Sequence, residues 1–173
     1  MKELLATTAM LLMVPALASA QSAEPKYRGQ GYVFFGLGPG TGSGWSTDNF
    51  IKQAGFGGEG FLYKGLGAGA EAAYASWGEY YDTAWIGSGD LSYHFGRHAA
   101  RFRVDPFVLG GVSIVGPTEA GGGRGSPAGN FGGGANLWLA DHAALRFEFR
   151  DVVGASFWSF DHVISFRVGV TFR

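Results

Sequence analysis

The sequence contains no cysteine among its 173 residues. This absence excludes a disulfide framework, a thiolate metal site and a lipid-modified cysteine behind a leader peptide. The sequence also lacks an excess of either charge, because 13 basic and 14 acidic residues give a formal net charge of −1 at pH 7. Nucleic acid is therefore not an expected partner, since proteins that bind it present a basic face.

Long apolar runs are missing beyond the N-terminal region. After Val14, no stretch is apolar for long enough to cross a bilayer as a helix. A segment that crosses a membrane would therefore have to do so as β-strands. Glycine and aromatic residues are abundant instead: there are 31 glycines, and aromatics make up 16% of the chain. Together with period-two patterning, this composition predicts strands and turns.

The first 20 residues have the features of a cleavable secretory signal. Lys2 precedes a short apolar core at 4–14, Pro15 ends it, and small residues at 18 and 20 mark a cleavage site. A membrane-spanning helix is the alternative, but 4–20 is at the lower limit of the spanning length. We therefore expect secretion to the periplasm, a short N-terminal segment at 21–28, and one domain at 29–173.

The clearest pattern lies in a predicted hairpin at 130–151, in its second arm. Apolar residues alternate there with charged ones, and a strand sends the two sets to opposite faces: Leu145, Phe147 and Phe149 to one, Arg146, Glu148 and Arg150 to the other. A soluble sandwich would bury the apolar face. A membrane barrel does the reverse, with apolar residues against lipid and charges in the lumen.

Eight strands are predicted, each near or above the length that a tilted strand needs to cross the hydrocarbon layer. They span 29–38, 53–64, 67–76, 83–95, 104–115, 130–140, 143–152 and 160–172. Alternate connections are long or medium (39–52, 77–82, 116–129, 153–159), and those between them are tight (65–66, 141–142) or short and basic (96–103). This alternation predicts an all-β fold, an antiparallel up-and-down transmembrane barrel with short periplasmic turns and longer outer loops.

The predicted lumen is charged. The alternation places eight titratable side chains inside: Glu59, Glu71, Asp90, His94, Arg146, Glu148, Arg150 and Arg167. An eight-stranded barrel is only wide enough for side chains to fill it, and buried charges are costly unless paired. We therefore expect a neutralising network that plugs the barrel. The first strand is apolar on both faces at 31–35, so its facing stays open.

Aromatic spacing agrees with a membrane-spanning wall. Trp85 and Phe95 lie ten residues apart on one predicted face, which corresponds to about 25 Å along the membrane normal for a tilted strand. Phe160 and Phe172 give about 30 Å by the same arithmetic. These four residues and Tyr93 are the predicted lipid-interface aromatics.

The chain resembles the small outer-membrane β-barrel family that includes the OmpA transmembrane domain and OmpX-like proteins. The resemblance covers almost the whole mature chain and rests on four stretches: 106–112, 132–137 with Asp141, the charged strand at 146–150, and 166–172. It implies a location in the outer membrane of a Gram-negative type of cell envelope. It also implies contact with outer-membrane lipid and lipopolysaccharide, assembly by the barrel-assembly machinery through the C-terminal strand, and a monomer.

Several functions are compatible with such a barrel. We favour a structural or surface-interaction role with a plugged interior; the alternative is a narrow gated, porin-like pore, since interior pairs in OmpA-like proteins can form and break. A lipid-modifying enzyme is less favoured, because His162 and Ser165 should point to opposite faces of their strand. A soluble lipocalin-like carrier would need an apolar cavity. No cofactor, metal site or catalytic residue is predicted, because the four histidines are scattered.

Overall fold

The computed structural model describes residues 28–42, 50–77, 82–96, 103–118, 125–154 and 160–173. The predicted signal at 1–20 and nearly all of the segment at 21–28 lie outside these residues. Within the described ranges, no helix is long and apolar enough to cross a membrane.

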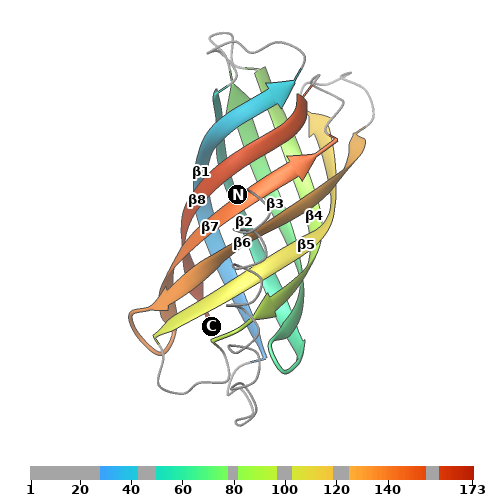
Figure 1. Ribbon diagram of the computed structural model, residues 1–173. Coiled ribbons are helices and arrows are strands. Elements are labelled where there is room, and N and C mark those ends of the chain that lie inside the picture. Colours follow the sequence, from blue (N-terminus) through green and yellow to red (C-terminus); the bar gives the residue numbers. More distant parts are fainter. Residues whose placement is uncertain (1–27, 43–49, 78–81, 97–102, 119–124, 155–159) are drawn as a thin grey trace, which may run out of the picture.

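Eight β-strands form the structure, one for each predicted strand (Figure 1). Several extend further than the sequence pattern indicated, because pairing with neighbours continues past the last alternating residue. Their bounds are β1 Gly29–Gly42, β2 Phe50–Tyr63, β3 Leu66–Trp77, β4 Asp82–His94, β5 Val104–Pro117, β6 Ser126–Trp138, β7 Ala143–Val153 and β8 Phe160–Phe172.

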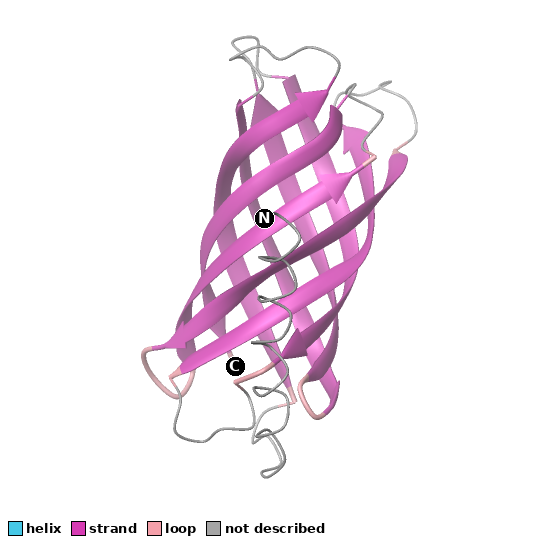
Figure 2. Cartoon of the chain, viewed as in Figure 1, coloured by secondary structure: helices cyan, strands magenta, loops and turns pink. Residues whose placement is uncertain are grey.

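The strands form one closed antiparallel barrel. Each strand pairs with the next along the chain, and β1 pairs with β8 to close the sheet. Strands make up the whole wall, and turns are confined to its two ends (Figure 2). Closure leaves no strand edge with unpaired backbone groups, which is the condition for a sheet in lipid. The predicted all-β, eight-stranded up-and-down barrel is confirmed.

The two ends of the barrel differ. We call the end with the β2–β3, β4–β5 and β6–β7 connections and the C-terminus the turn end, and the opposite end the loop end. The predicted sorting of connections by length is only partly right. The β4–β5 connection, residues 95–103, is longer than any connection at the loop end, and residues 78–81 form a short one there.

The β2–β3 turn also differs from its prediction at 65–66. Leu66 already pairs with Tyr63, so Lys64 and Gly65 form the turn. Both have positive φ, 38° and 85°. A two-residue turn with two positive φ values matches the twist of antiparallel strands, and glycine adopts this conformation without strain.

The two faces of the wall follow the predicted alternation. In β7, Arg146 and Arg150 are buried inside while Phe147, between them, is half exposed. The same alternation holds in β8, where Arg167 is buried and Phe166 and Val168 are exposed. The open facing of β1 is now settled. Tyr32 and Phe34 point inward, and the outward set consists of Val33, Phe35 and Leu37.

An apolar layer fills the interior at the loop end, which the prediction of a charged lumen missed. Ile51 lies near the start of β2, Val115 near the end of β5 and Val163 near the start of β8, and each is at most 1% exposed. We call the apolar layer the set of Ile51, Ala73, Ala75, Ile86, Val115, Ala128, Val152 and Val163, which pack in one buried cluster. The interior is thus charged in its middle and apolar toward the loops.

Candidate functional site: a charged network inside the barrel

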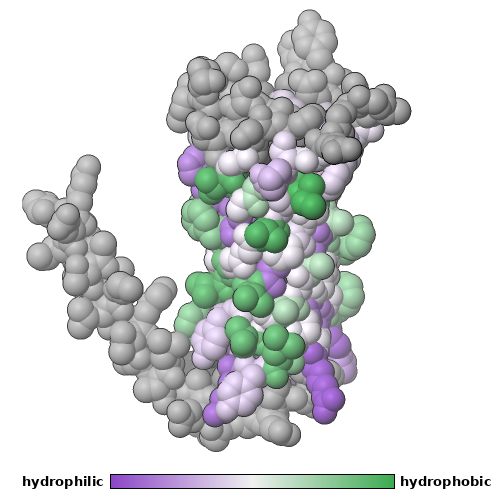
Figure 3. Space-filling view, turned by 90° about the vertical axis from the view of Figure 1, so that its right-hand side faces the viewer, coloured by the Kyte–Doolittle hydropathy of each residue, from purple (hydrophilic) through white to green (hydrophobic). Residues whose placement is uncertain are grey.

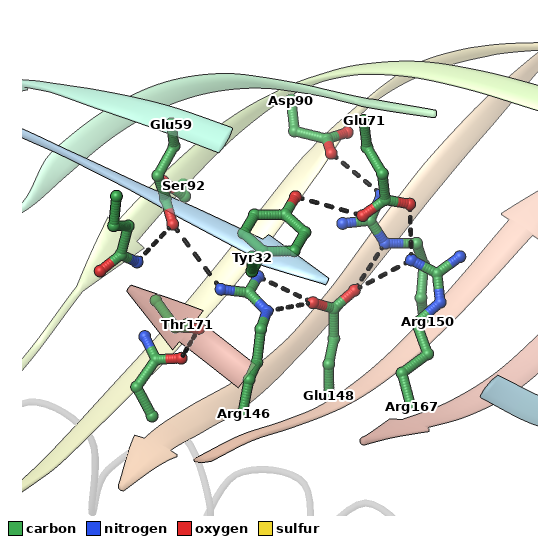
Figure 4. A network of polar contacts seen from close by, with 12 residues as sticks. Tyr32, Glu59, Glu71, Asp90, Ser92, Arg146, Glu148, Arg150, Arg167 and Thr171 are labelled. Carbon is green, nitrogen blue, oxygen red and sulfur yellow. Dashed lines mark hydrogen bonds and ion pairs between the residues drawn. The ribbon is translucent and has the colours of Figure 1, made fainter. Parts of the chain in front are cut away.

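All eight residues of the predicted lumen set lie inside the barrel. Glu59 comes from β2, Glu71 from β3, and Asp90 and His94 from β4; Arg146, Glu148, Arg150 and Arg167 come from β7 and β8. Their ion-paired side chains are at most 8% exposed. Alternation along each strand points them inward, and closure of β8 on β1 brings the arginines opposite the carboxylates of β2–β4 (Figure 4).

Glu148 lies at the centre of this network, between three guanidinium groups (Figure 4). Its Oε2 accepts from Arg146 through Nη2 at 2.7 Å and Nε at 2.9 Å. Its Oε1 accepts from Arg150 Nε at 2.8 Å and lies 3.4 Å from Arg167 Nη1. One carboxylate therefore faces three cations, and further acids are needed to balance them.

Glu71 and Asp90 supply this balance. Glu71 Oε1 lies 2.7 Å from Arg167 Nη1 and 3.4 Å from Arg150 Nη1. Its other oxygen accepts a hydrogen bond from the Tyr32 hydroxyl at 3.1 Å. Asp90 Oδ2 accepts from Arg150 Nη1 at 2.9 Å. Each arginine of this central group therefore has at least one carboxylate partner.

A second part of the network lies nearer the turn end. His94 is fully buried, with Nδ1 2.8 Å from Asp105 Oδ2 and Nε2 3.1 Å from Glu59 Oε2. Glu59 also accepts hydrogen bonds from Ser92 and from Gln30, and its Oε1 lies 3.7 Å from Arg146 Nη1. Glu59 thus joins the histidine to the arginine network.

Aromatic rings hold the arginines in place. The Arg146 guanidinium lies between the rings of Tyr32 and Phe107, at 4.2 and 4.1 Å from their centroids. Arg167 lies over Phe34 at 4.4 Å. Cation–π contacts of desolvated groups stabilise by about 2 kcal/mol. The sequence reasoning missed Tyr32, Phe34, Asp105 and Phe107, although the alternation at 104–108 already placed Asp105 and Phe107 on one face.

Glycines on the inward face make room for these long side chains. A Cβ atom on Gly57 would lie 2.6 Å from the Tyr32 ring, and one on Gly36 would lie 2.9 Å from Arg167 Cγ. Neither distance is possible without displacing a residue of the network. Part of the high glycine content is therefore explained by the packing of the lumen.

No protein-family model matches the sequence, and no curated protein matches it. Structures do match. The N-terminal β-barrel domain of OprF from Pseudomonas aeruginosa aligns with a TM-score of 0.60 at 14% identity, covering 86% of this chain and 98% of that one.

Two further matches agree. Neisserial surface protein A aligns with a TM-score of 0.63 at 9% identity, covering 83% of this chain and 96% of that one. The outer membrane protein OprG from Pseudomonas aeruginosa gives 0.59 at 11% identity, with 86% and 96% covered. The chain has the fold of the small outer-membrane β-barrels. At these identities the likeness shows the fold alone.

The predicted interface aromatics occupy both ends of this outer-membrane barrel fold. Trp85 is 41% exposed near the loop end of β4, and Phe172 is 52% exposed at the turn end of β8. Tyr93 and Phe95 are partly exposed at the turn end, with their rings in edge contact at 5.0 Å. The Phe160 side chain lies outside the described residues. The role of these aromatics at a lipid interface stays a prediction.

The residues considered for catalysis do not form a nucleophile and base pair. Ser165 is buried inside the barrel, where its hydroxyl accepts from Arg167 Nε at 3.1 Å. His162 points to the outer face, its side chain is 44% exposed, and its Nδ1 lies 2.8 Å from Asp151 Oδ2. The wall of the barrel separates the two. Among the described residues, no group of three or more histidines or acids could hold a metal ion.

Proposed function

We propose that this chain is an integral outer-membrane barrel with a structural or surface-interaction role, that its interior is permanently closed, and that it performs no catalysis. The observation that carries the proposal is the paired charged network across the lumen, with the apolar layer beside it.

The outer face of the barrel supports a location in lipid. Large apolar side chains are exposed on all eight strands, among them Phe56 at 65%, Val112 at 70% and Phe166 at 64%. Hydrophobic residues are spread over the wall in Figure 3. Water-soluble monomers rarely expose apolar surface on this scale, whereas a barrel in a bilayer requires it.

Two consecutive barriers support a closed interior. In the middle, long charged side chains from β2, β3, β4, β7 and β8 meet across the lumen, and the arginines have no more than 3% of their side-chain surface exposed. Toward the loop end, the apolar layer follows, with Ile51, Ala75 and Val115 at 0% exposure. An ion would have to separate buried ion pairs and then lose its hydration in an apolar section, and both steps are costly.

Location and closure can be tested on one refolded sample. An inserted barrel should migrate differently on a gel before and after boiling, and it should remain with the vesicles in carbonate. Vesicles that contain it should not swell in an isosmotic sugar solution, because no sugar enters a closed barrel. Release by carbonate would contradict the location, and rapid swelling would contradict closure.

A narrow gated pore is the second candidate, and one observation favours it. Arg150 Nη1 lies between Asp90 at 2.9 Å and Glu71 at 3.4 Å, while Glu71 Oε1 is shared with Arg167 at 2.7 Å. Because alternative partners lie at similar distances, pairs could exchange without leaving any charge alone. In that case, brief openings should appear in wild type and should change in frequency when Asp90 is replaced with asparagine.

A further inference from the structure

A ring of basic residues surrounds the turn end of the barrel. Arg28 precedes β1, Lys64 lies in the β2–β3 turn, Arg103 precedes β5 and Arg173 follows β8. All four are exposed. We call these four residues the basic collar. Backbone hydrogen bonds fix three of its members to the barrel. Phe61 in β2 donates to the Arg28 carbonyl, Trp138 in β6 donates to that of Arg103, and Arg173 donates to that of His142 in the β6–β7 turn.

Among the described residues, no acidic side chain forms an ion pair with Arg28, Lys64 or Arg103. Of the carboxylates that the structure describes at the turn end, Asp105 is buried and bonded to His94, and Asp141 is exposed in the β6–β7 turn. Arg173 contacts Asp141 through the backbone carbonyl, at 2.9 Å from its Nε, and its guanidinium lies 3.7 Å from the centroid of the Trp138 ring. These contacts hold the Arg173 cation at the rim while it stays exposed.

Three members of the collar, Lys64, Arg103 and Arg173, border the apolar outer wall. Tyr63 and Leu66 flank the β2–β3 turn at 66% and 39% exposure, Val104 follows Arg103 at 43%, and Phe172 precedes Arg173 at 52%. Hydrophilic residues gather at the lower end of the wall in Figure 3, directly below the hydrophobic ones. The rim therefore offers a cation beside an apolar surface, repeated around the barrel.

A cation next to an apolar surface matches one class of ligand. A lipid with an anionic headgroup places an acyl chain against the wall and its phosphate at the height of the collar. An acidic soluble protein would use the cations and leave the adjoining apolar residues without a partner. We propose that the basic collar binds anionic phospholipid headgroups of the leaflet at the turn end and anchors the barrel at a fixed depth. The proposal rests on the location in a membrane given above.

The experiment measures lipid selectivity directly. The wild-type protein is refolded into phosphatidylcholine vesicles that contain trace spin-labelled phosphatidylglycerol or phosphatidylcholine, and the fraction of motionally restricted label is compared. A basic residue near an anionic headgroup favours binding by about fivefold, so a clear preference for phosphatidylglycerol is expected. High salt should remove this preference, because exposed charges are screened.

Two variants make the result specific to the collar. Replacing Arg28, Lys64, Arg103 and Arg173 together with glutamine should bring the two lipids to equal association. Lys52→Gln, an exposed lysine near the loop end, should keep the wild-type preference. If the fourfold variant does not insert, Lys64→Gln alone should still lower the preference measurably.

The outcomes separate this proposal from the proposed location. Equal association of both lipids with an inserted wild-type barrel would overturn the collar proposal and leave the location intact. A preference that survives in the fourfold variant would also overturn it. No restricted lipid of either kind, with no heat-dependent gel shift, would overturn the location and the collar together.

Discussion

Replacing Glu148 with glutamine should destabilise the barrel strongly, because this carboxylate faces three arginines. Without its charge, Arg146 keeps a single carboxylate, Glu59, at 3.7 Å. Arg150 and Arg167 keep Asp90 and Glu71 at 2.9 and 2.7 Å. Breaking a buried ion pair from one side costs about 3–5 kcal/mol, and we expect Glu148→Gln to fall in this range.

A second substitution should recover part of that loss. Arg146→Met removes the cation that Glu148→Gln leaves poorly paired, and the unbranched apolar side chain can remain between the rings of Tyr32 and Phe107. The double variant should therefore be less destabilised than the sum of the two single variants, by about 1–3 kcal/mol. In the double variant, the two remaining central arginines still face two carboxylates.

Urea unfolding of the refolded barrel in lipid vesicles, followed by tryptophan fluorescence, measures these differences. Arg146→Met combined with His162→Gln is the matched control, since His162 lies on the outer face and is bonded to Asp151. The control pair should be additive within about 0.5 kcal/mol. If the Arg146 and Glu148 substitutions are equally additive, the two residues are not coupled and the reasoning is refuted.

Two further predictions concern the wall. Gly57→Ala should destabilise by about 1–3 kcal/mol, because its Cβ would lie 2.6 Å from an inward tyrosine ring, whereas Gly89→Ala should be nearly neutral, with nothing within 4 Å. If urea unfolding shows that Gly57→Ala and Gly89→Ala lower stability equally, the inward glycines are not needed to make room for lumen side chains. Val112→Arg, near the middle of the outer wall, should lower the free energy of unfolding in lipid by about 2–4 kcal/mol. Thr118→Arg, at the rim, should lower it by only about 0–1 kcal/mol. A tolerated arginine at Val112 would argue against a lipid-facing wall.

The sequence predicted which side chains enter the lumen, because that depends only on alternation. Arg146, Glu148 and Arg150 lie on one face of a strand whatever their neighbours are, so period two assigns them correctly. Partners could not be assigned in this way. Arg167 and Glu71 are 96 residues apart and meet because β8 closes on β1, which sets a register that no local pattern shows.

Three other features were beyond local reasoning for related reasons. Tyr32 and Phe34 stand in a strand that is apolar on both faces, so alternation carried no signal there. The apolar layer draws single residues from separate strands, and its members gather only after the strands tilt around the barrel. Connection lengths were misjudged because pairing continues beyond the alternating core of β1, β2, β5 and β6, which shortens the two connections predicted to be long.

Planar-bilayer recording tests closure of the barrel most directly. Wild-type protein, shown to be inserted by its gel shift, should give no steady current. Arg150→Ser, which removes a fully buried side chain from the network, combined with Ile51→Ser in the apolar layer, should give resolvable steps, and each single change should give fewer or smaller ones. Steady porin-like current through the wild-type barrel would contradict the account.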